Sequence, residues 1–266
     1  MSAAPPPREE QQSEFPFSFA FQPIVDAVSR KVVSWEALVR GPWDEPAWHV
    51  LNQIQPLDLP RFDQNARSAA IALAARLGID RPLHLNLVPR ALDANPKTLL
   101  ATIEAARQAS LALDSLVLEV PEAQVVENRT RIAALLREVR SLGVRLAIDD
   151  FGATWAALTL LDDLEPEQIK LDIRLVRSVD RTGPRQAILR AIRRACYDLK
   201  IEVIAEGVET QAEYEFLQGQ RIRLFQGYLF AKPAFEAFPP VHYPLPAARP
   251  VASSRPQPAA RARKRA

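Results

Sequence analysis

Short apolar runs alternate along the chain with longer segments whose apolar residues recur at helical spacing. The apolar runs predict about eight strands, at residues 17–25, 32–39, 82–88, 115–120, 144–149, 167–172, 201–205 and 222–227. The segments between most of them predict helices, at residues 60–78, 97–110, 127–142, 154–162, 183–199 and 209–219. Because the strands are apolar along nearly their whole length and alternate with helices, we expect parallel strands covered by helices.

About eight units of this kind predict a closed barrel. The chain has 266 residues, of which 48% are hydrophobic, and α/β barrels commonly reach this size as a single domain. Only Asp26 to Lys31 separate the first two predicted strands, which suits a hairpin and is too short for a parallel crossover. The predicted fold is therefore a (β/α)8 TIM-like barrel with an antiparallel first strand, over residues 17–243.

Charged residues close most of the predicted strands. Carboxylates stand at Glu36, Glu119, Asp149, Asp150 and Glu206, and Lys170 ends a further strand. A buried ionised carboxylate is costly unless it is paired or bound to a metal. Since the carboxy-terminal ends of barrel strands gather on one face, we expect these side chains to form one shared site.

The donor types at this face indicate a metal site. Asn86 adds an amide oxygen to the carboxylates, and such an oxygen-rich set suits Mg²⁺ or Mn²⁺ rather than zinc. The adjacent carboxylates of Asp149 and Asp150 would repel each other unless a cation lay between them. Without the other strand-end acids, this pair would be interpreted as a helix N-cap residue and a solvated neighbour. Two divalent ions about 3.5–4 Å apart can clamp a phosphodiester. We interpret His84, near Asn86, as a structural histidine because no second His or Cys accompanies it.

The single cysteine and the start of the chain indicate the cellular compartment. Cys196 lies in a helical pattern, so no intrachain disulfide can form and a buried thiol in a reducing compartment is expected. Residues 1–16 predict a disordered segment, rich in proline and charge at its start and without the apolar stretch of a signal peptide. No run is long enough to span a bilayer. We therefore expect a cytoplasmic protein.

The net charge of +2 is unevenly distributed. Residues 249–266 contain six basic residues and no acidic one, within a segment rich in Pro and Arg, residues 244–266, whose composition predicts disorder. This basic tail could contact an acidic protein partner, although a solubilising extension is the favoured interpretation. Nucleic-acid binding is disfavoured because no aromatic residues interleave the charges.

Seven blocks of sequence resemble, in the right order, the signature of EAL-domain cyclic-di-GMP phosphodiesterases. The blocks are Trp35-Glu-Ala-Leu-Val-Arg40, Leu85-Asn86, Leu118-Glu-Val-Pro-Glu122, Ile148-Asp-Asp-Phe-Gly152, Ile169-Lys-Leu-Asp172, Ala205-Glu-Gly-Val-Glu-Thr210 and Phe225-Gln-Gly-Tyr-Leu-Phe230. The resemblance extends from about Phe17 to Phe238. Glu-Ala-Leu alone would carry no weight, whereas seven ordered blocks make the resemblance specific.

The resemblance implies a metal-dependent enzyme that hydrolyses cyclic di-GMP to linear pGpG with two ions, Mg²⁺ or Mn²⁺, and that forms a homodimer. By position, one ion would be held by Glu36, Asn86, Glu119 and Asp149, and the second by Asp149, Asp150 and Glu206. Lys170 matches a lysine that contacts the attacking water, and Gln226 matches a glutamine near it.

Further positions match substrate contacts of the family. These are Gln22, Leu38, Arg40 and Asp172, with the guanidinium of Arg40 reaching a phosphate. Glu122 matches a glutamate that anchors the loop linking metal binding to dimerisation. Beside metal ions, like-charge repulsion and desolvation would lower the pKa of Lys170 and let it help deprotonate water. The alternative is a salt bridge to Asp172 or Asp149, which could coexist with that role.

One block departs from the family pattern. After Asp-Asp-Phe-Gly the family usually has a small residue and then Gly-Tyr-Ser, whereas residues 153–157 here read Ala-Thr-Trp-Ala-Ala. Thr154 stands where the family has glycine, and a β-branched residue is strained if that position needs a positive φ. We expect an active or, because of the altered loop 152–157, a weakly active phosphodiesterase, since no acid of the signature is missing. The alternative is a degenerate domain that binds cyclic di-GMP or a protein partner without cleavage.

Overall fold

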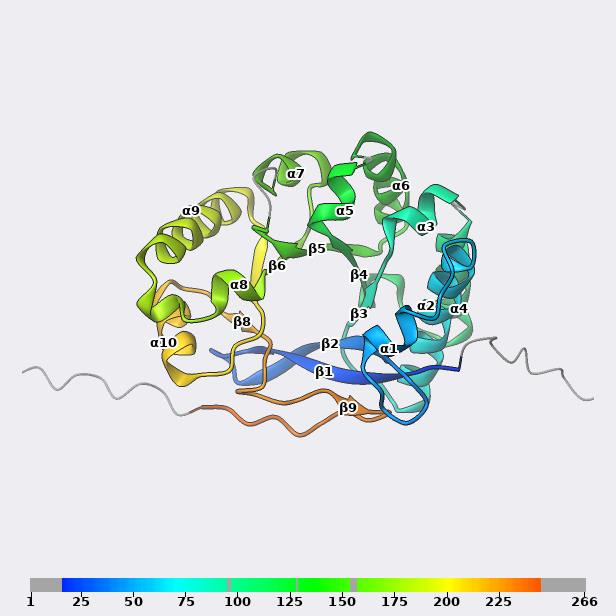
Figure 1. Ribbon diagram of the computed structural model, residues 1–266, viewed down its shortest axis with the longest axis horizontal. Coiled ribbons are helices and arrows are strands. Elements are labelled where there is room, and N and C mark those ends of the chain that lie inside the picture. Colours follow the sequence, from blue (N-terminus) through cyan, green and yellow to red (C-terminus); the bar gives the residue numbers. More distant parts are fainter. Residues whose placement is uncertain (1–15, 95–96, 128, 154–156, 245–266) are drawn as a thin grey trace, which may run out of the picture.

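Nine strands form one sheet whose first eight members close into a barrel (Figure 1). The computed structural model describes residues 16–94, 97–127, 129–153 and 157–244. The strands are β1 (Ser18–Asp26), β2 (Lys31–Arg40), β3 (Leu83–Asn86), β4 (Leu116–Pro121), β5 (Arg145–Phe151), β6 (Gln168–Leu171), β7 (Glu202–Ala205), β8 (Leu224–Phe225) and β9 (Ala234–Phe235). All eight predicted strands are present.

The barrel closes through its first strand. β2 to β8 follow one another in parallel, and β1 lies antiparallel between β8 and β2. β9 adds to the same strand, where Ala20 and Phe21 pair with Phe235 and Ala234. The predicted TIM-like barrel with an antiparallel first strand is therefore confirmed.

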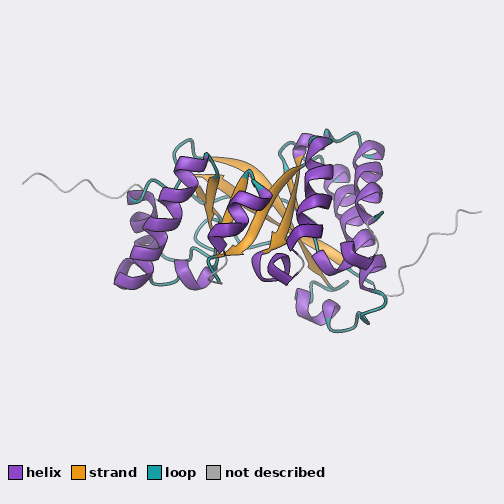
Figure 2. Ribbon diagram, turned by 90° about the horizontal axis from the view of Figure 1, so that it is seen from above, coloured by secondary structure: helices purple, strands orange, loops and turns teal. Residues whose placement is uncertain are grey.

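Helices cover the outside of the barrel, so that the strands occupy the centre of Figure 2. They are α1 (Ala47–Leu51), α2 (Leu59–Arg76), α3 (Pro89–Ala94), α4 (Thr98–Gln108), α5 (Glu122–Glu127), α6 (Arg129–Ser141), α7 (Ala157–Leu164), α8 (Ile173–Val176), α9 (Gly183–Leu199) and α10 (Gln211–Gly219), with 3₁₀ turns at Leu113–Ser115 and Val179–Arg181. The sequence pattern missed α1, α3, α5 and α8, because one or two turns are too short to show helical periodicity. None of the helices in the described segments combines the length and hydropathy that crossing a membrane requires.

The strands have two chemically different faces. In β4, Leu116, Leu118 and Val120 belong to the main apolar core that packs against the helices. The residues between them point into the barrel, and one of these is the buried Glu119. This alternation places the charged strand-end residues inside the barrel and leaves the helix-facing side to supply the hydrophobic stabilisation.

Cys196 illustrates the outer layer. It lies on α9 with Leu189 and Ile192 at helical spacing, and all three side chains are buried. Burial raises the pKa of the Cys196 thiol to about 12, which makes it a poor nucleophile. The expectation of a buried core thiol agrees with this environment.

The chain ends remain outside the described residues. The predicted disordered segments, residues 1–16 and 244–266, fall almost entirely within the undescribed positions 1–15 and 245–266. The proposed domain boundaries and the basic tail therefore remain predictions.

A close backbone approach at Gly227 connects the end of β8 to the loop after β7. A Cβ atom at Gly227 would lie 2.1 Å from the carbonyl oxygen of Val208 and 2.4 Å from its amide nitrogen. The same two segments exchange backbone hydrogen bonds, from Val208 to Gln226 and from Leu229 to Val208. Only glycine fits this junction without displacing backbone.

We therefore expect Gly227→Ala to lower the free energy of unfolding by about 2 kcal/mol or more, because the clash is with backbone. Gly219→Ala is the matched control: Gly219 ends α10, and an added Cβ there meets nothing within 4 Å. Its stability should stay within about 1 kcal/mol of the parent. Urea unfolding of the three proteins measures both effects, and equal stability of the two variants would contradict the close approach.

Candidate active site

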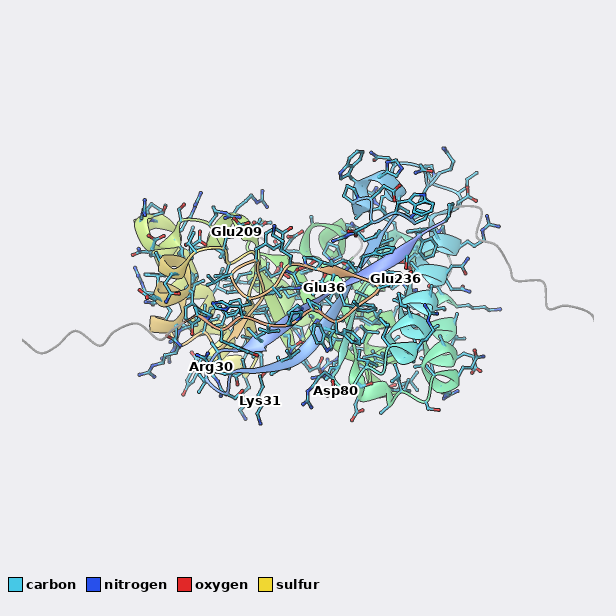
Figure 3. The ribbon with its side chains drawn as sticks, turned by 90° about the horizontal axis from the view of Figure 1, so that it is seen from below. Arg30, Lys31, Glu36, Asp80, Glu209 and Glu236 are labelled. Carbon is cyan, nitrogen blue, oxygen red and sulfur yellow. The ribbon has the colours of Figure 1, made fainter. Side chains whose placement is uncertain are left out.

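The carboxy-terminal ends of the barrel strands bring eight polar side chains together at one end of the barrel. They come from β2 (Glu36), β3 (Asn86), β4 (Glu119), β5 (Asp149 and Asp150), β6 (Lys170), the residue after β7 (Glu206) and the residue after β8 (Gln226). In Figure 3, Glu36 lies near the middle of the molecule, while Lys31, which begins the same strand, lies at its lower edge and Glu209 lies on the opposite side. The sequence-predicted acids therefore do converge.

Lys170 lies at the centre of this cluster. Its Nζ lies 2.5 Å from Glu206 Oε1, 2.8 Å from Glu119 Oε2, 3.1 Å from Glu36 Oε2 and 3.4 Å from Asp149 Oδ1. The side chain is only 1% exposed, so these contacts are poorly screened by water. One buried ammonium thus joins the ends of four different strands.

The charge state of Lys170 in the ion-free site is set by its four carboxylate neighbours; the lowered pKa expected beside metal ions remains a prediction. Burial alone would lower its pKa, but Asp149, Glu119, Glu206 and Glu36 together raise the pKa of Lys170 well above its usual value. In the site without ions, the lysine therefore keeps its proton. Of the two predicted salt bridges, the one to Asp149 is present, whereas the Asp172 carboxylate pairs with Arg174.

A β-bulge turns both aspartates of the adjacent pair toward the site. Ile148 pairs with Ile169 and Phe151 pairs with Leu171, so β5 contains one residue more than β6 over this stretch. Asp150 takes the left-handed conformation, with φ of 53°. In a regular strand neighbouring side chains point to opposite faces, but here oxygen atoms of Asp149, Asp150 and Glu206 lie within 4.8 Å of one another.

Amide side chains hold Glu36 in place. Gln226 Nε2 donates to Glu36 Oε2 at 2.7 Å, and Asn86 Nδ2 donates to Glu36 Oε1 at 3.2 Å. Gln226 Nε2 also lies 3.3 Å from Gln22 Oε1, and Gln22 in turn donates to the carbonyl oxygen of Ala231 at 3.0 Å. Burial would raise the pKa of Glu36, but Lys170 and the bond from Gln226 lower it to about 2.

Glu119, Glu206 and Asp150 resist ionisation. Burial and the charge of Glu36 raise the pKa of Glu119 well above its usual value, and burial also raises the pKa of Glu206, with Asp149 adding to the effect. Burial and the Asp149 charge raise the pKa of Asp150 as well. Four carboxylates thus share one ammonium and a fifth, Asp150, lies beside two of them, so added positive charge would stabilise the cluster.

The oxygen atoms of the cluster fit a divalent cation. Asp149 Oδ1 is buried and accepts no hydrogen bond from the described residues. It lies in the group of three acids whose oxygen atoms are mutually within 4.8 Å. Carboxylate oxygens without soft sulfur or imidazole donors suit a hard cation such as Mg²⁺, Mn²⁺ or Ca²⁺.

Two cavities flank the cluster. One, of about 340 Å³, is lined by Gln22, Lys170, Glu206 and Tyr228 among others. The second, of about 380 Å³, is lined largely by apolar residues of β1 to β3 and α2, together with Asn86. The two cavities share Glu36, Leu38 and Asp149, so the carboxylates lie between them.

Comparisons with known proteins agree with this geometry. The model of the EAL domain matches residues 8–233. The chain belongs to the EAL domain family. The chain spans about half or less of the length of the curated relatives that it matches. It is 33% identical to the blue light- and temperature-regulated antirepressor BluF of Escherichia coli, over 85% of this chain and 56% of that protein. It is 28% identical to the cyclic di-GMP phosphodiesterase PA2567 of Pseudomonas aeruginosa, over 82% of this chain and 38% of that protein.

Solved structures of EAL proteins share the fold. A standalone versatile EAL protein from Vibrio cholerae O395, in its c-di-GMP-bound form, superposes with a TM-score of 0.82 at 37% identity, covering 86% of this chain and 97% of that one. A manganese and cyclic-diGMP complex of BlrP1 from Klebsiella pneumoniae gives a TM-score of 0.80 at 38% identity, covering 84% of this chain and 57% of that one. Cyclic di-GMP is thus bound in both of these neighbours, and manganese in the second.

Glu122 contacts the start of the loop that departs from the EAL pattern. Its Oε2 accepts hydrogen bonds from the amides of Gly152 at 2.7 Å and Ala153 at 3.1 Å. Gly152 has a φ of 93°, and an added Cβ would lie 2.5 Å from Leu175. Thr154, Trp155 and Ala156 lie outside the described residues, so the expected effect of this part of the loop remains a prediction.

Two of the residues matched to substrate contacts have partners of their own in this EAL domain. Asp172 caps α8, accepting from the amide of Arg174 at 2.6 Å, and is also bound by the Arg174 guanidinium. The Nε of Arg40 lies 3.6 Å from Asp44, and its Nη1 donates to the carbonyl oxygen of Val39. Leu38 and Gln22 line the first cavity.

The sequence reasoning missed several residues at the site. Ile173, Glu209 and Tyr228 line the first cavity, and Tyr228 is 56% exposed. Tyr228 belongs to the Phe225–Phe230 block, where an aromatic residue next to Gly227 was the available signal. His84 was interpreted as structural, and its Nδ1 lies 2.7 Å from Glu119 Oε1, directly beneath the cluster.

We expect Mn²⁺ to bind more tightly as the pH rises. The raised pKa values of Glu119 and Glu206 mean that these acids hold protons that a cation must displace, so affinity rises with pH up to these pKa values, by about tenfold per pH unit for each proton released, and levels off above them. Calorimetric titration at pH 6, 7 and 8, in buffers of different ionisation enthalpy, measures affinity and proton release together. Glu104→Gln, on the exposed face of α4, is the control and should behave like the parent. Affinity independent of pH would contradict this electrostatic description.

Proposed function

We propose that this EAL domain hydrolyses cyclic di-GMP to linear pGpG with two divalent ions, Mg²⁺ or Mn²⁺, in the cytoplasm. The observation that carries the proposal is the convergence of four carboxylates on Lys170, with a fifth, Asp150, beside Asp149 and Glu206, between two cavities. Membership of the family, and a manganese and cyclic-diGMP complex of a neighbour with 38% identity, support this substrate and these cofactors.

The proposed ligands of the two ions are shared among four strands and the loop after β7. Glu36, Asn86, Glu119 and Asp149 would hold one ion, and Asp149, Asp150 and Glu206 the other. Bound there, the ions would supply charge stabilisation for the attacking and leaving oxygens of a phosphodiester. The bulge at Asp149 and Asp150 supports this sharing, because it aims two successive carboxylates at one place.

Lys170 and Gln226 would position the reacting groups. Lys170 Nζ lies 2.5 Å from Glu206 Oε1 and 3.4 Å from Asp149 Oδ1, two of the proposed ion ligands, so it would contact a water bound between them and, with the ions lowering its pKa, help to deprotonate that water. Gln226 donates to Glu36, and its buried Oε1 accepts no hydrogen bond from the described residues. That oxygen is available to accept a hydrogen bond from a bound water.

The substrate would extend over both cavities. A cyclic dinucleotide has two bases on a ring with two phosphodiesters, so one base can enter each cavity while a phosphodiester lies over the shared Glu36 and Asp149. Gln22, Leu38 and Tyr228 would contact it from the first cavity. Arg40 and Asp172 would contribute only after exchanging their present partners, Asp44 and Arg174.

The loop held by Glu122 is the proposed connection to a homodimer interface. Glu122 bonds the two amides that directly follow Phe151, at the end of the strand carrying both aspartates. A change in that loop would therefore reach Asp149 and Asp150 through a short stretch of backbone. A protein partner for the basic tail remains a separate proposal.

A receptor function is the second candidate. The relative from Escherichia coli is named an antirepressor, and the altered residues 153–157 lie next to the aspartate pair. In this case the domain would bind cyclic di-GMP or a protein without cleaving it. The complete set of acids favours the enzyme.

Glu36→Ala should reduce turnover of cyclic di-GMP by at least about a hundredfold while the protein stays folded. Losing a metal ligand forfeits several kcal/mol of transition-state stabilisation, and each 1.36 kcal/mol is about tenfold in rate. Glu104→Ala, on the exposed face of α4, is the matched control and should keep parental turnover. Chromatography of pGpG formed with Mn²⁺ measures the rate, and circular dichroism verifies the fold. Parental turnover by folded Glu36→Ala would refute the assignment.

Restoring the family pattern at the loop separates the two candidates. The triple variant Thr154→Gly, Trp155→Tyr, Ala156→Ser should raise kcat more than it changes the dissociation constant, because the altered coupling acts where charge develops during reaction. Both constants are measured for parent and variant with saturating Mn²⁺ and with saturating Mg²⁺. If both proteins bind cyclic di-GMP and neither cleaves it, the receptor function replaces the enzyme.

A further inference from the structure

A third cavity, of about 320 Å³, lies at the opposite end of the barrel from the carboxylate cluster. Its lining comes from the amino-terminal ends of the parallel strands, including Arg145, which begins β5, and Gln168, which begins β6. Figure 3 shows this end at the lower edge of the molecule, where Arg30, Lys31 and Asp80 are labelled. The proposed chemistry of the EAL domain makes no use of this cavity.

The deep part of the cavity contains buried polar atoms without partners. His84 is fully buried and Gln168 is 5% exposed, and both line the cavity. Within the described residues, His84 Nε2, Gln168 Oε1 and Arg145 Nε form no hydrogen bond. Unpartnered polar atoms in a buried position are costly, so three of them around one cavity indicate a polar occupant.

Arginine side chains surround the same cavity. Arg145, Arg193, Arg221 and Arg223 contribute to its lining, whereas Asp26 and Glu202 are the acids in it. Arg223 pairs with Asp26 at 2.7 Å, and Glu202 accepts a hydrogen bond from Gln168. The remaining positive charge is suited to an anion, and the guanidinium group binds phosphate with two parallel hydrogen bonds.

We propose that this cavity binds a small phosphate monoester that also carries hydroxyl groups. The arginines would bind the phosphate, and the hydroxyls would bind His84 Nε2 and Gln168 Oε1. A hydroxyl can donate or accept, so it suits His84 in either tautomer. The cavity volume lies at the lower end of the range for ligand sites, which favours a sugar phosphate over a dinucleotide.

The site lies on the same barrel interior as the carboxylate cluster. His84 faces the cavity through Nε2, while its Nδ1 lies 2.7 Å from Glu119. Gln168 precedes Lys170 by two residues on β6, so both side chains point inward. When no metal ions are bound, the carboxylates at the other end of the barrel repel a phosphate. Binding of a phosphate ester measured in chelator therefore does not arise from the carboxylate cluster.

The test is calorimetric titration of the full chain, in chelator, with ribose 5-phosphate, glucose 6-phosphate and glycerol 3-phosphate, and with inorganic phosphate and ribose as reference ligands. At least one of the three esters should bind to the protein. Inorganic phosphate and ribose should each bind to the protein about tenfold more weakly than that ester, or not at all. Absence of binding by all three esters at millimolar concentration would overturn the proposal. Binding of inorganic phosphate as tight as that of the best ester would overturn the role of His84 and Gln168.

Variants locate the binding. Arg193→Gln and Arg145→Gln should each lower the affinity for the ester by about tenfold, since each removes a charge-assisted hydrogen bond to the phosphate. Arg194→Gln is the matched control: it lies on the same helix α9, pairs with Asp198 at 2.8 Å and does not line the cavity. Its affinity should equal that of the parent. If Arg193→Gln, folded by circular dichroism, binds like Arg194→Gln, the ester occupies another part of the chain, such as the basic tail, and the proposal fails.

Discussion

The buried ion cluster around Lys170 is the interaction on which the rest of this structure depends. A fully desolvated ammonium is stable only with close counter-charges, and four carboxylates supply them. Each carboxylate comes from a different strand, so the cluster is possible only if the barrel is closed and its parallel strands are in register. The cluster in turn holds more negative charge than one lysine can neutralise, and this imbalance makes the face a cation site.

The barrel interior consequently differs from the apolar layers typical of TIM barrels. Polar side chains continue from the carboxylates at one end, through Glu119 and His84, to Gln168 and Arg145 at the other. A small apolar group inside, Ile24, Ile204 and Leu224, is separate from the main core. The hydrophobic stabilisation therefore comes from the opposite faces of the strands, which pack against the helices.

Local backbone irregularities adapt this regular frame to its chemistry. The bulge in β5 converts two adjacent aspartates, which a regular strand would separate, into neighbours at one site. The contact of Gly227 with Val208 brings Gln226 against Glu36 from a strand of only two residues. Glu122, by bonding the amides of Gly152 and Ala153, connects α5 to the end of the same bulged strand. Small deviations from ideal geometry thus determine where the functional oxygens lie.

The sequence alone predicted the barrel and the convergence of the strand-end acids with Lys170. Strand and helix periods, a short first connection and acids at strand ends are local signals, and closure of the barrel brings such ends together whatever the loops between them. Tertiary structure decided what depends on distance and burial. Four carboxylates converging on Lys170 raise its pKa in the ion-free site, and their number could not be read from the sequence because close counter-charges are a property of the folded site. Two further features depend on segments far apart in the chain, which no local pattern encodes: the bulge at Asp149 and the arginine-lined cavity beneath His84. The ion pairs of Asp172 and Arg40 are formed with near neighbours in sequence, but only the folded backbone shows them.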